Sequence, residues 1–110
     1  MTREDEDIAQ VLANGWAVRF LLVGPYKVAY AAVKGHEVHF KALDPRQAIQ
    51  RNRLRAFVRE LEQEFGYLTT RVEVGDEANQ RFVRLMGFTD TWQDDTYRYF
   101  CMTALPFERG

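Results

Sequence analysis

The sequence predicts an α+β domain in which a mostly antiparallel sheet, with one parallel pair, is flanked by helices. Two observations lead to this prediction. Strand-forming runs alternate with stretches of helical periodicity in the order α-β-β-β-α-β-α-β-β, and turn residues separate them. A strand, a long helix and another strand follow one another in the middle, which implies a right-handed crossover between neighbouring parallel strands. A length of 110 residues corresponds to one domain, 1–110.

The first half reads as a short helix followed by a three-stranded meander. Ile8, Val11 and Leu12 have the spacing of an amphipathic helix, which Asn14-Gly15 can end. Strand-forming residues then fill the ranges 16–23, 26–33 and 37–43. The breaks at Gly24-Pro25 and Gly35-His36 suit tight hairpins, so we expect antiparallel pairing.

The second half begins where Asp44-Pro45 stops the third strand. Residues 44–61 look like a helix, and apolar residues continue at helical spacing until Gly66: Leu54, Phe57, Val58, Leu61 and Phe65. Residues 67–74 form a strand, and Asp76 can cap a helix that Gly87 ends. The residues expected to share one side of that helix are Ala78, Phe82, Leu85 and Met86. Two last strands, 88–93 and 96–105, flank a turn at Asp94-Asp95.

Composition narrows the classes of function. The formal net charge is -1, which argues against a nucleic-acid or membrane-surface protein, since any anion site must then be local. The apolar run 17–23 is interrupted by Arg19 and too short to span a bilayer, and the acidic start is unlike a signal peptide. We therefore expect a cytoplasmic protein. Cys101 is the only cysteine; it excludes an internal disulfide, and its strand-like surroundings favour a packed thiol.

The long helix carries its charges against its own dipole. Its beginning holds Arg46, Arg51, Arg53 and Arg55, whereas Glu60, Glu62 and Glu64 gather near its end. The helix dipole places partial positive charge at the N-terminus, which disfavours arginines there unless another interaction stabilises them. They either meet an anion or form a solvated basic surface, which could face an acidic partner such as the tail at residues 3–7.

Residues 72–88 and the order of elements resemble the GNAT acyltransferase family. Gly87-Phe88 matches the Gly-Phe pair that opens a strand after the family's helix, Asp76 stands at an expected Asn, and Val83 stands where a Tyr is usual. The resemblance implies a GNAT-like domain without the family's first strand and first helix, so that acceptor recognition is minimal or shared across an oligomer. Among relatives, the chain looks most like small, reduced GNAT-like proteins encoded by phages.

The same resemblance implies an acetyl-CoA site. The family signature Arg/Gln-x-x-Gly-x-Gly/Ala fits residues 47–52, where Gln47 agrees but Gln50 and Asn52 replace the glycines. Glycines there let backbone N–H groups approach the pyrophosphate at a helix N-terminus. Arginine side chains can compensate with charge-assisted contacts. The cofactor-binding residues predicted in this way are Leu43, Gln47, Gln50, Arg51, Asn52 and Arg53.

Acetyl transfer to an amine also needs a proton acceptor. The family often uses a carboxylate on the central strand, which indicates Glu37, and His39 lies on the same face two residues later. Both are also ordinary residues for an exposed strand. His36 and His39 point to opposite faces, so we predict no metal site. Val83 cannot donate a proton, and the phenols of Tyr97 and Tyr99 are conceivable substitute acids, with ordinary packing in the sheet as the favoured alternative.

The sequence thus leads to two functional hypotheses. The first is a GNAT-fold protein related to acyl-CoA-dependent N-acetyltransferases, which binds acyl-CoA and an unknown amine acceptor. The alternative is a catalytically inactive structural or interaction protein associated with a phage virion. It would act as a homo-oligomer or with a virion partner, in the host cytoplasm or the particle.

Overall fold

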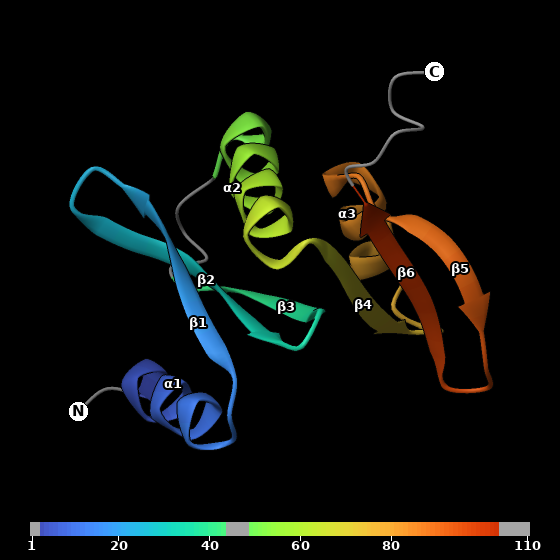
Figure 1. The fold of residues 1–110 in the computed structure, drawn as a ribbon, viewed down its shortest axis with the longest axis horizontal. Coiled ribbons are helices and arrows are strands. Elements are labelled where there is room, and N and C mark those ends of the chain that lie inside the picture. The colour runs from blue at the N-terminus through green and yellow to red at the C-terminus, as the bar shows by residue number, and fades with distance from the viewer. Residues whose placement is uncertain (1–2, 44–48, 104–110) are drawn as a thin grey trace. The chain divides into compact units, whose positions relative to one another are not determined.

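The computed structural model describes residues 3–43 and 49–103, and the chain divides into two compact units, residues 1–50 and 51–110 (Figure 1). Over the described residues it forms three helices and six strands in the predicted order. All strand pairings within each unit are antiparallel. The predicted parallel pair would join β3 to β4, which belong to different units.

The first unit contains one helix and a meander. Its elements are α1 (Arg3–Ala13), β1 (Ala17–Val23), β2 (Tyr26–Lys34) and β3 (Glu37–Ala42). The two predicted hairpins are confirmed, because β2 pairs with β1 and with β3 in antiparallel register. Gly24 and Gly35 adopt positive φ angles of 60° and 64°, which L side chains rarely do.

Helix α1 turns a narrower side inward than the sequence predicts. Ile8 and Val11 are half-buried, whereas Leu12 is 53% exposed, so the placement of Leu12 on the buried side was wrong. On the helical wheel Ile8 lies between Val11 and Leu12, about 60° from Val11 and about 40° from Leu12, and the helix turns its Val11 side inward. The chain leaves the helix at Asn14, whose backbone N–H donates to the Gln10 carbonyl over 3.1 Å.

The meander has two chemically different faces. One face is apolar and includes the buried residues Ala31, Val33 and Val38. On the opposite face, Ala32 pairs with His39 and Tyr30 pairs with Lys41 across β2 and β3. Side chains alternate between the two faces along a strand, and residues that are directly paired on neighbouring strands point to the same face. This second face therefore brings polar groups of β3 beside small and aromatic residues of β2.

The second unit contains two helices and three strands. Its elements are α2 (Arg51–Phe65), β4 (Tyr67–Glu73), α3 (Glu77–Met86), β5 (Thr89–Gln93) and β6 (Tyr97–Thr103). The central strand β6 pairs with β4 on one side and β5 on the other, which leaves β5 at the edge. Asp94 accepts hydrogen bonds from the backbone N–H groups of Thr96 and Tyr97, which confirms the predicted turn.

Helix α2 begins later than the sequence suggested. Ile49 and Gln50 precede the helix, which starts at Arg51, and residues 44–48 lie outside the described part of the chain. The buried side consists of Phe57, Val58, Leu61 and Glu62. The unusual charge order is confirmed, because the first turn has no acidic residue and the last turn no basic one.

Helix α3 is capped as predicted at both ends. The Asp76 carboxylate accepts a hydrogen bond from the Asn79 backbone N–H over 3.1 Å, and Gly87 ends the helix in the left-handed region with φ +110°. The buried side differs from the prediction: it is formed by Gln80, Val83 and Met86, whereas Ala78 and Leu85 are exposed. Gln80 belongs inside because its amide donates to the carbonyls of Glu73 and Val74, at the end of β4.

Candidate functional site

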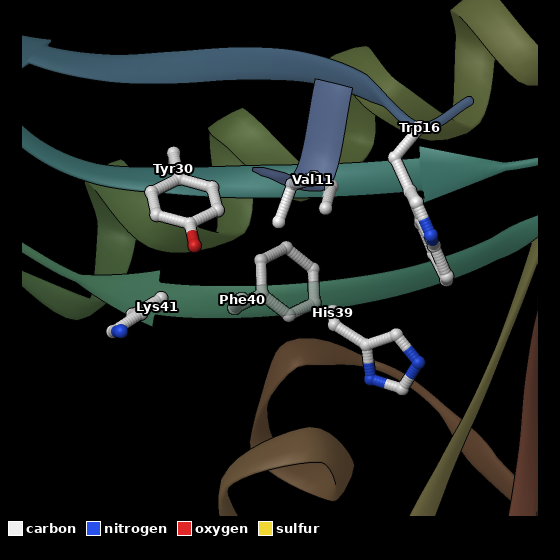
Figure 2. A pocket seen from close by; sticks show the side chains of 7 residues that line it. Val11, Trp16, Tyr30, His39, Phe40 and Lys41 are labelled. Atoms are coloured by element: carbon white, nitrogen blue, oxygen red, sulfur yellow. The ribbon is translucent and has the colours of Figure 1, made fainter. Parts of the chain in front are cut away.

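A pocket of about 380 Å³ lies in the first unit, between α1 and the meander (Figure 2). Its volume falls within the roughly 300–1,000 Å³ that is usual for small-molecule sites. Six side chains labelled in Figure 2 line it: Val11, Trp16, Tyr30, His39, Phe40 and Lys41. Ala32 completes the lining with a small side chain, and most of the surface is apolar.

Local structure explains how these residues meet. Tyr30 and Ala32 lie on β2 directly opposite Lys41 and His39 of β3, so the four share a face of the meander. Lys41 Nζ lies 3.0 Å from an Asp7 carboxylate oxygen and thereby joins β3 to α1. This ion pair lies at the surface, with both side chains about half exposed, so its contribution is geometric more than energetic.

Trp16 occupies the corner where α1 leads into β1. Its ring lies edge to face with the His39 imidazole, with 5.5 Å between centroids. Lys34 Nζ lies 5.9 Å from the Trp16 ring centroid and donates to the Asn14 carbonyl over 3.1 Å. The indole therefore neighbours both an imidazole and an ammonium group.

The two predicted proton acceptors are in direct contact. His39 Nε2 lies 2.5 Å from Glu37 Oε2, and the two side chains are 42% and 35% exposed. They meet because residues two apart on a strand project from the same face. His39 lines the pocket, and Glu37 lies behind it on the same strand. Such a contact lets the carboxylate fix the tautomer and orientation of the imidazole.

The predicted cofactor-binding residues fall into separate segments. Leu43 is half-buried just after β3, and its backbone N–H donates to the Val28 carbonyl over 2.9 Å, so only its carbonyl and side chain remain for a ligand. Gln47 lies outside the described residues. Gln50 precedes α2 and is exposed. Arg51, Asn52 and Arg53 form the first turn of α2 and are likewise exposed.

The glycine replacements are compatible with this backbone. Asn52 is helical, and no described non-glycine residue, Gln50 included, has a positive φ angle. The conformational freedom of glycine is therefore not needed at either position. What the replacements add is side-chain volume on an exposed surface.

The two predicted phenols are part of a network on the last hairpin. Tyr99 donates its hydroxyl hydrogen to Asp94 Oδ2 over 2.9 Å and stacks on Trp92 with 4.4 Å between centroids. The Asp94 hydrogen bond raises the pKa of the Tyr99 hydroxyl. Hydrogen bonds from the Tyr97 and Thr96 N–H groups lower the pKa of Asp94. Tyr97 stacks under the Arg71 guanidinium, 4.6 Å from its centroid.

Cys101 is half-buried in β6. Burial, with a further contribution from the Glu62 charge, raises the pKa of its thiol. A reactive thiol needs the opposite shift, so Cys101 is not activated as a nucleophile.

Residues 3–43 and 49–103 contain no group of three or more His, Cys, Asp or Glu side chains arranged to hold a metal ion. Within the same residues, none of the helices has the length and apolar character needed to cross a membrane.

Sequence reasoning missed most of the pocket lining. Trp16, Tyr30 and Lys41 lie far apart in the sequence and come together only through the register of the meander and the position of α1. One signal was available: Glu37, His39 and Lys41 alternate with apolar residues in β3 with a period of two, which marks one polar face.

No family model matches the sequence, and no curated protein matches it either. Solved structures do match. The structure of AAC(6')-Ib in complex with paromomycin and acetyl-CoA matches with a TM-score of 0.68 and 14% identity, over 92% of this chain and 72% of that chain. The ribosomal-protein-alanine N-acetyltransferase of Brucella melitensis matches with a TM-score of 0.55 and 18% identity, over 91% and 76%.

The ribosomal-protein-S18-alanine N-acetyltransferase of Escherichia coli matches with a TM-score of 0.59 and 18% identity, over 89% of this chain and 75% of that chain. At these identities the likeness concerns the fold, and it agrees with the resemblance read from residues 72–88. The predicted fold class is confirmed, and the chain has the fold of the GNAT N-acetyltransferases.

Proposed function

We propose that this protein is an acyl-CoA-dependent N-acetyltransferase that acts on a primary amine. The observation that carries the proposal is the contact between His39 and Glu37 at the pocket, in a chain with this fold. An acceptor amine must lose a proton when it becomes an amide, and an imidazole beside a carboxylate is suited to take it.

The first turn of α2 would hold the anionic part of acetyl-CoA. Arg51 and Arg53 are exposed there, and no acidic side chain of that turn competes with phosphate. The helix N-terminus adds backbone N–H groups and the positive end of the dipole. The positive charges of Arg51 and Arg53 suit the negatively charged phosphate groups of acetyl-CoA. The side chains of Gln50 and Asn52 are exposed to solvent, so they can adopt rotamers that leave room for the phosphate groups.

His39 and Glu37 would handle the proton of the acceptor. Bound acetyl-CoA supplies a thioester, whose acyl carbon bonds to the amine nitrogen as the carbon–sulfur bond breaks. His39 accepts the proton that the nitrogen releases, while Glu37 holds the imidazole N–H and stabilises the imidazolium. Val83 is buried and apolar, so it donates no proton to the departing thiolate, which takes one from water.

Isothermal titration calorimetry with acetyl-CoA tests the proposal, combined with mass spectrometry of a mixture of primary amines. We expect binding that weakens with ionic strength and acetyl-CoA-dependent mass increases of one acetyl group on an amine. An absence of heat at high protein concentration, at low salt, would refute the proposal.

A second candidate is an inactive GNAT-fold protein with a structural or interaction role, of the reduced kind encoded by phages. Two observations favour it: Val83 replaces the usual Tyr, and β5 is an exposed edge strand that carries the exposed Trp92. A protein that ignores acetyl-CoA but forms a defined oligomer by native mass spectrometry, or copurifies with virions, would support this candidate.

A further inference from the structure

We propose that the pocket of the first unit selects a small primary monoamine carried on an apolar, preferably aromatic, body. This inference rests on the proposed function and adds the chemical class of the acceptor. It starts from the composition of the walls: Trp16 and Tyr30 present aromatic surface, and Val11 adds aliphatic surface. A ligand with many hydroxyl groups would leave these walls without matching contacts.

The polar groups of the pocket lie at defined places. At one end, His39 reaches into the pocket with Glu37 against its Nε2. Lys41 projects from the same face of β3 two residues after His39, which corresponds to about 7 Å along the strand. A single amine can therefore address His39 and Glu37 while the rest of the molecule lies against the aromatic walls.

The fixed charges around the pocket disfavour a second ammonium group. Two chain ammonium groups lie on this face, because Lys34 pairs directly opposite Glu37 and Lys41 pairs opposite Tyr30. Asp7 is within 3.0 Å of Lys41, and Lys34 donates to the Asn14 carbonyl. The carboxylates of Asp7 and Glu37 already have partners in the chain, Lys41 and His39, so the second ammonium group of a polyamine would compete with a chain group for its counter-charge. A monoamine brings only the group that His39 and Glu37 receive.

Binding can be measured without acetyl-CoA through Trp16. Trp16 lines the pocket, and the chain has one other tryptophan, Trp92 in the second unit. A Trp92→Phe background therefore makes indole emission report on the pocket. The probes are 2-phenylethylamine, 2-phenylethanol, which lacks the amine, and spermidine, which lacks the apolar body. We expect 2-phenylethylamine to change the emission and to bind about tenfold or more tighter than either comparison compound.

Two variants of α1 separate occupation of the pocket from general effects. Val11→Phe fills the pocket and should weaken 2-phenylethylamine binding by about tenfold or more. Leu12→Phe places the same aromatic side chain at the next, exposed position and should leave binding unchanged. Thermal unfolding checks that both variants fold. Should Val11→Phe not fold, Ala32→Val narrows the pocket from β2 instead, with the same expected loss.

The acyl-transfer step is measured separately as the release of free thiol from acetyl-CoA. The signal from the protein's own Cys101 thiol is subtracted. If Trp16 responds selectively to 2-phenylethylamine and no amine is acetylated, the pocket assignment stands and the proposed function fails. Spermidine binding as tightly as 2-phenylethylamine, or binding unchanged by Val11→Phe, would overturn the inference.

Discussion

His39 Nε2 points at Glu37 Oε2 from two positions further along β3, at a distance of 2.5 Å. The contact makes the two side chains one chemical unit, so their contributions to catalysis should not be independent.

Replacement of this pair tests its role in the reaction. His39→Asn should lower kcat/KM by about 100-fold or more, because a positioned base contributes about 10²–10⁴. Glu37→Gln should cost less, and the double variant little more than His39→Asn alone. The dissociation constant of acetyl-CoA should not change. His36→Asn, which replaces the only other histidine, is the matched control. Full activity of His39→Asn would remove this residue from the mechanism.

The arginines at the start of α2 give a second prediction. Arg51→Ala with Arg53→Ala should weaken acetyl-CoA binding by about 10-fold or more at low salt, since charge-assisted hydrogen bonds to phosphate are lost. The difference from the unchanged protein should shrink as salt rises. Arg81→Ala, on the exposed surface of α3, is compared with each single arginine variant as the control for the loss of one positive charge. An equal effect of Arg81→Ala would show that the attraction is non-specific.

A third prediction concerns the end of α3. Gly87 has φ +110°, and a Cβ added there would lie 2.9 Å from Met102 Cε. Gly87→Ala should therefore lower the free energy of unfolding by about 1–3 kcal/mol, as measured by urea titration. Gly66→Ala is a matched control, because Gly66 has φ +92° but no atom within 4 Å of the added Cβ. It should cost less. Equal losses would mean that Met102 moves aside freely.

A fourth prediction follows from the pair between α3 and β5. Arg84 contacts Asp90 with two hydrogen bonds of 2.9 and 2.8 Å, and they lower the pKa of the Asp90 carboxyl. A carboxyl with a lowered folded-state pKa contributes stability above its unfolded pKa, and this contribution is lost as the pH falls below about 4. Asp90→Asn should reduce the loss of stability on acidification. Asp95→Asn, in the exposed neighbouring turn, is the control, and thermal unfolding between pH 3 and pH 7 is the measurement.

The sequence predicted those features that depend on local chemistry. Asp76 and Gly87 define the ends of α3 because a capping carboxylate and a left-handed glycine act within a few residues. The hairpins at Gly24 and Gly35 were predictable for the same reason. Glu37 and His39 could be placed together because the period of a strand is two.

What the sequence could not predict depends on packing between distant segments. The start of α2 at Arg51 is not marked by a capping residue, and the apolar spacing fits an earlier start equally well. Glu62 is 1% exposed because it lies one turn after Val58, on the buried side of the helix, a position that a charged side chain does not predict. The pocket requires Val11 and Trp16 to lie beside β2 and β3, which no local pattern contains.

Strand β5 is exposed along its whole length, and its pairing with β6 shifts register between Asp90 and Trp92. A regular open edge is a template for adding strands from other molecules, and an irregularity with a charged residue beside it interrupts that template. We expect the same irregularity to hinder fibril growth in concentrated solutions of the protein, and a deletion of Thr91 that straightens the edge to remove this protection.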